Sequence, residues 1–190
     1  ALRSAREIGG GVDAVDRNLM TLNRFTDKAQ EAVVAAQQAA GQANHPQIEP
    51  EHLLTTLLEQ NQGVVPEVLR KLGVNLAEAT AALTREVARF PQAHGGAAPA
   101  ASPRLRAVLA AAQGEAERMK DEFVSTEHLL LAIAVEQGRS EAVRVLTSLG
   151  VSRDRILEAL VGIRGSQRVT DQTPEGKYQA LERYGRDLTE

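Results

Sequence analysis

The feature that most constrains the fold of this chain is an internal repeat. The sequence reads IEPEHLL at 48–54 and VSTEHLL at 124–130, and a Leu-Gly-Val triplet follows each copy, at 72–74 and 149–151. The two His residues are 76 positions apart (128 minus 52) and the triplets are 77 apart, which fits a one-residue insertion near Gly138. Repetition at a fixed spacing predicts two copies of one structural unit, which bury their apolar faces against each other.

The first copy has the apolar period of α-helices. Thr26 suits an N-cap, and the apolar positions after it recur every three or four residues, at Ala29, Ala32, Val33, Ala36 and Ala40. Three more helices are predicted: one starts at Pro50, one follows Pro66 and ends at Gly73, and one is capped by Asn75. The first copy is therefore expected to form a four-helix unit.

The second copy repeats this pattern. Ser125 and Ser152 are its expected N-caps, Gly150 is its expected C-cap, and its first apolar stripe is Leu105, Val108, Leu109, Ala112, Ala116 and Met119. Small Ala-rich faces allow the two units to approach closely. We predict an all-α fold in which two four-helix repeats, related by a pseudo-two-fold axis, pack into one globular domain without strands.

The remaining stretches separate the repeats or lie outside them. PQAHGGAAPAASP has the Gly and Pro content of a linker, and the residues before Asn23 contain a triple Gly, no sustained period and a candidate natural start at Met20. The polar C-terminus has Tyr178, Leu181 and Tyr184 at helical spacing but no second partner face. The predicted organisation is a tail or added extension at 1–22, repeat 1 at 23–90, a linker at 91–103, repeat 2 at 104–165 and a flexible connector at 166–190.

Composition excludes several classes of function. A formal net charge of −3 and 3% aromatic residues provide neither a basic surface nor stacking platforms for nucleic acid. The chain has no Cys, which rules out disulfides and thiolate metal sites and suits a reducing compartment. No apolar run approaches the roughly 18 residues of a membrane span. We expect a cytoplasmic protein that is monomeric as an isolated domain and has neither membrane nor nucleic-acid partners.

Catalytic and metal sites are not expected either. The repeated Glu-His pairs, Glu51-His52 and Glu127-His128, place neighbouring side chains about 100° apart on a helix, so they do not converge. The sequence has no HExxH, no phosphate-binding GxxxxGK[ST] and no GxSxG. The two Glu residues suit the positive ends of helices. Alternatively, each could join an apolar lip, Ile48 or Val124, in a shallow site for exposed protein segments.

Several motifs resemble a known family. RFTDKAQEAVVAAQQAA, IEPEHLL, DEFVSTEHLLLAI and the two Leu-Gly-Val triplets closely resemble the double N-terminal repeat of the Clp and heat-shock-hundred unfoldases, from Asn23 to about Arg164. The closing GKYQALERYGRDLTE, 176–190, is similar to the connector of the ClpB branch. ClpC-type repeats usually read GTEHILLGL in both halves, whereas this chain reads EPEHLLTTL and STEHLLLAI, which favours ClpB.

The resemblance implies a function for the whole protein and for this part of it. It implies the substrate-recognition and regulatory N-terminal domain of a hexameric, ATP-dependent disaggregase chaperone of the heat-shock response. Such a protein binds unfolded or aggregated proteins and refolds them with a DnaK-type chaperone system. ATP and Mg belong to the full-length ATPase, and no cofactor and no enzymatic activity are expected in this chain. The alternatives are a ClpC- or ClpA-like domain that docks adaptors or phosphoarginine, and a mobile cap that regulates the ATPase ring.

The resemblance also implies site residues. The client-contacting positions of the family match Thr26, Asp121 and Glu127, and Phe123 and Val124 are expected to contribute to an apolar groove. Glu51 is included in the substrate site as the repeat partner of Glu127, and in ClpC relatives the matching pair helps to bind phosphoarginine. The competing interpretation is that Thr26 acts only as an N-cap, and that Asp121 is only a solvated loop acid.

Overall fold

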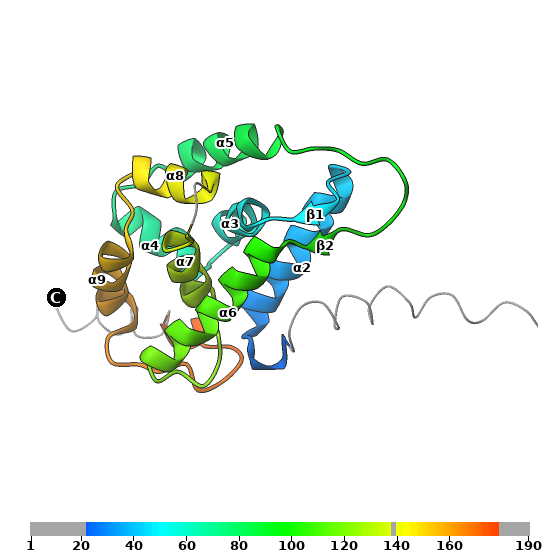
Figure 1. Ribbon diagram of the computed structural model, residues 1–190. Coiled ribbons are helices and arrows are strands. Elements are labelled where there is room, and N and C mark those ends of the chain that lie inside the picture. The colour runs from blue at the N-terminus through cyan, green and yellow to red at the C-terminus, as the bar shows by residue number, and fades with distance from the viewer. Residues whose placement is uncertain (1–21, 138–139, 179–190) are drawn as a thin grey trace, which may run out of the picture.

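The computed structural model describes residues 22–137 and 140–178 of the chain (Figure 1). Most of the expected tail, the insertion near Gly138, and Leu181 and Tyr184 lie outside the described residues. The helices are η1 (Leu22–Arg24), α2 (Asp27–Gln42), α3 (Pro50–Glu59), α4 (Val64–Lys71), α5 (Leu76–Val87), α6 (Pro103–Arg118), α7 (Thr126–Ala134), α8 (Glu141–Ser148) and α9 (Arg153–Arg164). The predicted all-α class with two four-helix repeats is confirmed.

The predicted caps begin and end these helices. The side chains of Thr26, Asn75 and Ser152 accept hydrogen bonds from backbone N–H groups three residues later, at 3.3, 3.2 and 3.3 Å respectively. Gly73 and Gly150 have φ values of +80° and +74°, a conformation that is easy only for glycine, and this ends α4 and α8. Local sequence therefore sets most helix boundaries, although α4 begins at Val64, before the Pro66 from which it was expected to start.

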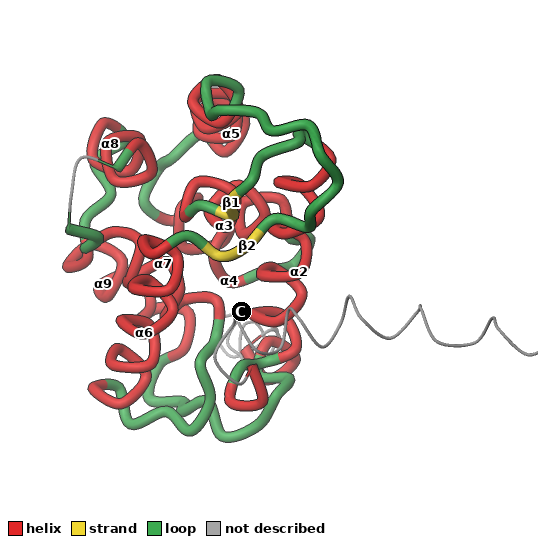
Figure 2. Tube along the Cα trace, turned by 45° about the vertical axis from the view of Figure 1, so that its right-hand side comes forward, coloured by secondary structure: helices red, strands yellow, loops and turns green. Residues whose placement is uncertain are grey.

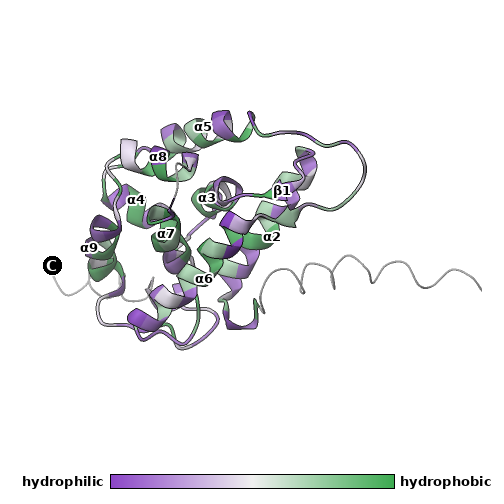
Figure 3. Ribbon diagram, in the orientation of Figure 1, coloured by the Kyte–Doolittle hydropathy of each residue, from purple (hydrophilic) through white to green (hydrophobic). Residues whose placement is uncertain are grey.

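Helices α3 and α7 form the centre of the molecule (Figures 1 and 3). Every residue of α7 from Thr126 to Ile133 is buried, and so is every residue of α3 except Thr55 and Glu59. Helices α2 and α6 each contact both central helices. The apolar stripe at Ala29, Ala32, Val33, Ala36 and Ala40 is buried as the period predicted, because small side chains let α2 lie close to α3.

The two repeats share one core because the outer helices of each repeat pack against outer helices of the other. Helix α4 of repeat 1 packs against α9 of repeat 2, and α5 packs against α8. A single cluster of buried apolar side chains runs through both repeats, from Phe25 to Tyr178. Each repeat therefore completes the core of the other, as expected of two units that cannot bury their apolar faces alone.

Two short strands contradict the expectation of an entirely helical chain. β1 (Gln47–Ile48) and β2 (Ala100–Ala101) pair in parallel, with Ile48 opposite Ala101 (Figure 2). A second parallel bridge joins Phe25 and Val124. Val124 lies 76 positions after Ile48, and Ala101 lies 76 after Phe25. The two pairings are therefore equivalent by the repeat, with the roles of repeat 1 and repeat 2 interchanged. They connect the segments that precede the central helices to the opposite repeat, a long-range pairing that no local propensity signals.

Residues 166–178, called the C-terminal segment below, differ from the loose connector expected there. Val169 and Tyr178 are buried, and the segment crosses from α9 to the region below α6 and α2 (orange to red in Figure 1). Backbone hydrogen bonds hold it, because Glu122 N donates to Val169 O at 2.8 Å and Asp27 N donates to Gln172 O at 2.9 Å. The first part of the expected connector is thus docked on the domain.

Candidate functional site

The predicted site residues of repeat 2 lie together with Thr26. Thr26 N donates to Val124 O at 2.9 Å, and Asp121 and Glu127 flank Val124 in the loop before α7 and in its first turn. Thr26, Asp121, Val124 and Glu127 are buried, whereas Phe123 is partly exposed. We expected Glu127 to lie at a shallow surface site. That expectation is wrong for this structure, since the Glu127 side chain has no exposed area.

The His residues of the repeated motif organise the starts of both central helices. Nδ1 of His52 accepts from Glu49 N at 2.9 Å, and Nδ1 of His128 accepts from Ser125 N at 2.8 Å. Each His thus satisfies an N-cap backbone donor, the task that Glu or Gln performs in a capping box. The acidic residues Glu51 and Glu127 lie in the first turns as expected, but their side chains have other partners.

Asp121 is the centre of a buried polar cluster, the Asp121 cluster, which comprises Asp121, Glu127, His128 and Arg164. Its Oδ2 lies 2.7 Å from Nε2 of His128, and its Oδ1 accepts from Arg164 Nη2 at 2.7 Å and from Val169 N at 2.8 Å. Since Nδ1 of His128 accepts a backbone N–H, Nε2 carries the hydrogen that faces Asp121. The expectation that Asp121 could be a solvated loop acid is excluded by these contacts.

The environment of Asp121 favours its charged form. Burial alone would raise the pKa of Asp121, but the hydrogen bonds from His128, Arg164 and Val169 outweigh that effect and lower the pKa to about 2. The carboxylate is therefore ionised at neutral pH. Its interactions with donors from three separate parts of the chain make it a cross-link between the α6–α7 loop, α9 and the C-terminal segment.

Glu127 is less well satisfied than Asp121. Its Oε1 lies 3.4 Å from Arg164 Nη1, but neither carboxylate oxygen has a hydrogen-bond donor among the described residues. Arg164 also lies 5.9 Å from the ring centre of Tyr178, and it is the cation that faces both Asp121 and Glu127. The Arg164 guanidinium thus faces two carboxylates, and its interaction with Glu127 is weaker than its interaction with Asp121.

The C-terminal segment covers this region with two further polar groups. Oε1 of Glu175 and the hydroxyl of Tyr178 are buried without hydrogen-bond partners among the described residues. Burial, with a smaller contribution from the neighbouring carboxylate of Glu127, raises the pKa of Glu175 to about 7. Burial likewise raises the pKa of Tyr178. Several buried polar groups around Glu127 are therefore incompletely satisfied.

Glu51 belongs to a separate cluster, although it is the repeat partner of Glu127. Its Oε1 accepts from Arg104 Nη2 at 2.8 Å and from Ala142 N, at the start of α8, at 3.2 Å. Arg104 also pairs with Glu49 and Glu136. Glu51 therefore joins α3, α6 and α8 across the repeat interface, and its hydrogen-bond partners among the described residues lie outside the C-terminal segment.

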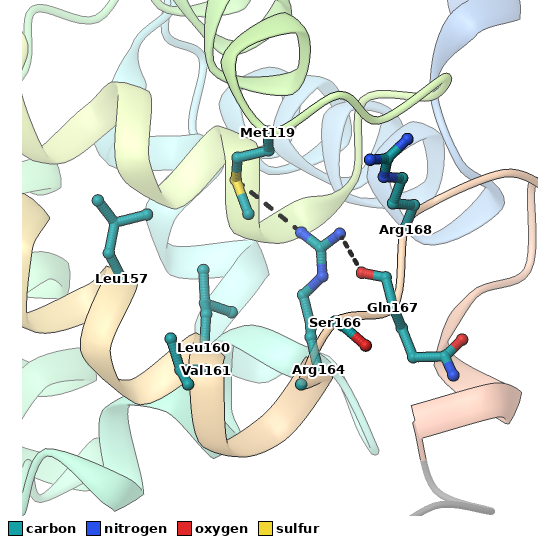
Figure 4. Close-up of a pocket in the computed structure, with 9 residues that line it drawn as sticks. Met119, Leu157, Leu160, Val161, Arg164, Ser166, Gln167 and Arg168 are labelled. Atoms are coloured by element: carbon teal, nitrogen blue, oxygen red, sulfur yellow. Dashed lines mark hydrogen bonds between the residues drawn. The ribbon is translucent and has the colours of Figure 1, made fainter.

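A pocket of about 310 Å³ opens beside the Asp121 cluster (Figure 4). Its apolar wall comes from α9 and from the end of α6, and its lining residues are Met119, Leu157, Leu160, Val161, Arg164, Gly165, Ser166, Gln167 and Arg168. Figure 4 shows the guanidinium of Arg164 between Met119 Sδ and Gln167 O, which it reaches at 3.9 and 2.9 Å. Phe123 and Val124, the expected contributors to an apolar groove, are not among its lining residues.

Among residues 22–137 and 140–178, no cluster of three or more His, Asp or Glu side chains could hold a metal ion. The histidine pair of repeat 1, His45 and His52, is a packed pair instead, with Nδ1 and Nε2 2.9 Å apart and Phe90 against both rings. No helix in this described part of the chain is long and apolar enough to cross a membrane.

Sequence reasoning missed Arg164, Val169, Glu175 and Tyr178. The last three lie in a stretch that was expected to be a connector, and Arg164 resembled an ordinary basic residue at a helix end. One signal was present in the repeat: Asp121 is 76 positions after His45, just as His128 is 76 after His52. Aligning the two copies would have shown an ionisable residue seven positions before each motif His, His45 before His52 and Asp121 before His128.

Comparisons with known proteins agree with this architecture. The family model described as "Clp repeat (R) N-terminal domain" matches residues 24–149. The chain is 41% identical over 175 residues to the chaperone protein ClpB of Nitratidesulfovibrio vulgaris, an alignment that covers 90% of this chain and 20% of that protein. The chain thus spans about a fifth of the length of the curated relatives that it matches.

Solved structures show the same fold at low sequence identity. The N-terminal domain of Hsp104 from Candida albicans has a TM-score of 0.70 and 22% identity, covering 80% of this chain and 98% of that one. A ClpV N-domain solved in complex with a VipB peptide has a TM-score of 0.60 and 17% identity, covering 74% of this chain and 86% of that one. The chain belongs to the Clp repeat (R) N-terminal domain family, and its resemblance to ClpB-type chaperones is confirmed.

Proposed function

We propose that this domain binds exposed apolar segments of unfolded or aggregated proteins, weakly, on behalf of a ClpB-like disaggregase. The supporting observation is the pocket between α6 and α9, where an apolar wall adjoins the buried Asp121 cluster through Arg164. Val161, at its edge, is 70% exposed, the largest exposed fraction among the large exposed hydrophobics of the described residues. A concave apolar surface with few polar groups is the usual form of a ligand site.

The open face of the pocket favours binding of apolar client side chains over basic ones. The two carboxylates of the cluster are buried, and the exposed charged residue of the lining is Arg168. A client segment would therefore contribute mainly apolar contacts, with a dissociation constant above about a micromolar. Weak binding suits a tethered domain, because the tether supplies a high local concentration. A ClpV N-domain of the same fold has been solved with a VipB peptide, which supports a peptide-binding role.

The wider activity belongs to the same proposal. The full-length protein would be a homohexameric ATPase that uses ATP and Mg, acts in the cytoplasm and cooperates with a DnaK-type chaperone system. This domain would neither bind nor hydrolyse ATP, and in isolation it would be a monomer. Thr26 would serve the site as the N-cap that fixes the start of α2 beside Val124.

The phosphoarginine alternative is disfavoured by two ion pairs. Glu51 lies 2.8 Å from Arg104, and Glu127 lies 3.4 Å from Arg164, so each motif Glu already faces a guanidinium of its own chain. With the C-terminal segment docked, a phosphoarginine side chain would have to displace an internal arginine to reach either carboxylate. The mobile-cap and adaptor alternatives remain outcomes of the experiment described next.

The experiment is a titration of isotope-labelled protein with a reduced, permanently unfolded model protein, followed by NMR. We expect saturable shifts at Met119, Leu157 and Val161. Val161→Asp should weaken binding at least fivefold because it places a charge on the apolar wall, whereas Val34→Asp is the matched control, on an exposed valine of α2 that does not line the pocket. Equal binding by the two variants would refute the pocket, and no shifts at saturating client would favour the cap. Tighter binding of a folded partner would favour adaptor docking.

A further inference from the structure

The C-terminal segment crosses the surface that contains the predicted client residues. Asp27 N, next to Thr26, donates to Gln172 O at 2.9 Å, and Glu122 N, next to Asp121, donates to Val169 O at 2.8 Å. Asp121 itself accepts from Val169 N at 2.8 Å. Around Val169 these contacts resemble those of a peptide bound through its backbone, with Val169 as a fully buried side-chain anchor, whereas residues 175–178 of the segment are helical.

The far end of the segment closes over Glu127. Tyr178 is 4% exposed and belongs to the apolar core cluster, and its ring faces the guanidinium of Arg164. With the segment in place, both carboxylate oxygens of Asp121 accept hydrogen bonds from donors of its own chain, and Glu127 has no exposed area. Neither carboxylate can contact a client in this state.

The same closure leaves several polar groups unsatisfied. Both oxygens of Glu127, Nε of Arg164, Oε1 of Glu175 and the hydroxyl of Tyr178 are buried without hydrogen-bond partners among the described residues. A buried polar atom without a partner costs free energy, because it has lost the hydrogen bonds that water would otherwise supply. Among the described residues, Arg164 is the cation that pairs with both Glu127 and Asp121, which leaves this part of the cluster short of positive charge. A bound basic group would supply both a donor and a charge.

We propose that residues 169–178 are an internal occupant of the client site, and that an extended client segment with basic and apolar side chains binds by displacing them. The displaced state exposes Glu127 to a client Lys or Arg, and the place of the Tyr178 ring takes an apolar client side chain. The domain therefore has a closed form, in which only the pocket beside α9 is available, and an open form that binds more tightly. This inference rests on the proposed client-binding function.

The affinity consequence follows from the population of the open form. If only a fraction of molecules is open, the apparent dissociation constant is the intrinsic one divided by that fraction. Tyr178→Ala removes the ring that anchors the segment and should raise affinity about tenfold for a domain that is one-tenth open. Tyr178→Phe is the matched control, because it keeps the ring and removes a hydroxyl that has no hydrogen-bond partner. Val169→Asp is a second releasing variant that leaves Tyr178 intact.

The probes are two synthetic peptides of equal length, rich in Val and Tyr, that carry Arg in one version and Glu at the same positions in the other. Binding is measured by fluorescence anisotropy, and opening is measured by hydrogen exchange at the amides of Asp27, Glu122 and Val169. We expect faster exchange in Tyr178→Ala and Val169→Asp, tighter binding of the Arg peptide by both, little change for the Glu peptide, and exchange and affinity in Tyr178→Phe that do not exceed those of the wild type.

Each contrary result has a distinct meaning. If exchange shows that the segment is released and the affinity for the Arg peptide stays at the wild-type value, the internal-occupant inference is overturned while client binding stands. If release abolishes binding, the segment is part of the client site, which also overturns the inference. If neither the wild type nor the released variants bind peptide or unfolded protein, the proposed function itself fails, and the occupant inference fails with it.

Discussion

Nε2 of His128 lies 2.7 Å from Oδ2 of Asp121, and both side chains are buried. At the equivalent place in repeat 1, 76 residues earlier, Nε2 of His52 lies 2.9 Å from Nδ1 of His45. The two repeats thus keep the same buried contact with different chemistry: an ionised carboxylate connected to Arg164 in repeat 2, and an imidazole pair packed against Phe90 in repeat 1. Duplication kept the geometry, and only the repeat 2 copy lies under the C-terminal segment.

Asp121→Asn should lower the free energy of unfolding by about 3 kcal/mol, because it leaves Arg164 buried with a single, weakly placed carboxylate. Urea unfolding followed by circular dichroism measures this as a lower midpoint at an unchanged slope. Glu158→Gln, an exposed carboxylate on the same helix as Arg164, is the control and should stay within about 0.5 kcal/mol of the wild type. A wild-type midpoint for Asp121→Asn would show that the cluster does not stabilise the fold.

The histidine pair of repeat 1 should make stability fall in mild acid. Burial and, to a smaller extent, the neighbouring His45 lower the pKa of His52 to about 4 from an ordinary 6.5. The unfolded chain therefore binds a proton that the folded protein resists, so stability is full above pH 6.5 and declines as the pH falls toward 4, by about 1 kcal/mol per pH unit.

Urea midpoints of the wild type and His52→Gln at several pH values between 7 and 4.5 measure this dependence. The variant should lose much of the slope, whereas His94→Gln, in the exposed loop before α6, should retain it. Identical slopes for the wild type and His52→Gln would mean that another group is responsible.

Glu175 should make docking of the C-terminal segment depend on pH in the opposite direction. Its pKa is raised to about 7 from an ordinary 4.5, mainly by burial and to a smaller extent by Glu127 and Asp27, against the opposing effects of a backbone hydrogen bond and of Lys28. Docking is thus fully supported below pH 4.5 and weakens as the pH rises to about 7, which should increase segment opening at least tenfold between pH 5 and pH 8.

Hydrogen exchange at Val169, corrected for the intrinsic rate, measures this opening. Glu175→Gln should remain closed at pH 8, since an amide has no charge to bury, while Glu122→Gln, an exposed neighbour of the segment, should open like the wild type. Opening that is independent of pH in the wild type would contradict the buried position of Glu175.

Gly73→Ala should destabilise the protein by about 1 kcal/mol although no atom lies within 4 Å of the added Cβ. The cost comes from the backbone, since φ is +80° at this helix end. Gly114→Ala is the matched contrast: it has equal space, lies inside α6 and should stabilise by about 1 kcal/mol. Thermal or urea unfolding measures both, and a common sign for the two variants would contradict the backbone explanation.

Much of the fold could be predicted because its signals are local. The period of the Ala and Leu stripes, the N-caps Thr26, Asn75 and Ser152 and the glycines after α4 and α8 each act within one helical turn of their own position. The short parallel pairings could not be predicted in the same way, because Ile48 and Ala101 are brought together only after both repeats have packed.

The sequence predicted which residues of the candidate site lie together, but it did not predict their burial or their partners. Thr26, Asp121, Val124 and Glu127 do lie together, yet they are buried, and the apolar pocket beside them comes from α9 and the end of α6 instead of Phe123 and Val124. The partners that determine the state of these carboxylates, Arg164 and the C-terminal segment, are 37 or more residues away along the chain (164 minus 127). Their contacts have no local pattern from which to read them.

The sequence alone determined that the chain is a duplicated, all-α domain, because a repeat of 76 residues and a helical apolar period depend only on the order of residues. The tertiary structure decided which charges meet: that Arg104 faces Glu51, that Arg164 faces both Asp121 and Glu127, and that Val169 and Tyr178 close over that site. The physical reason is that burial and ion pairing are properties of position in space, which is fixed only when distant segments share one core.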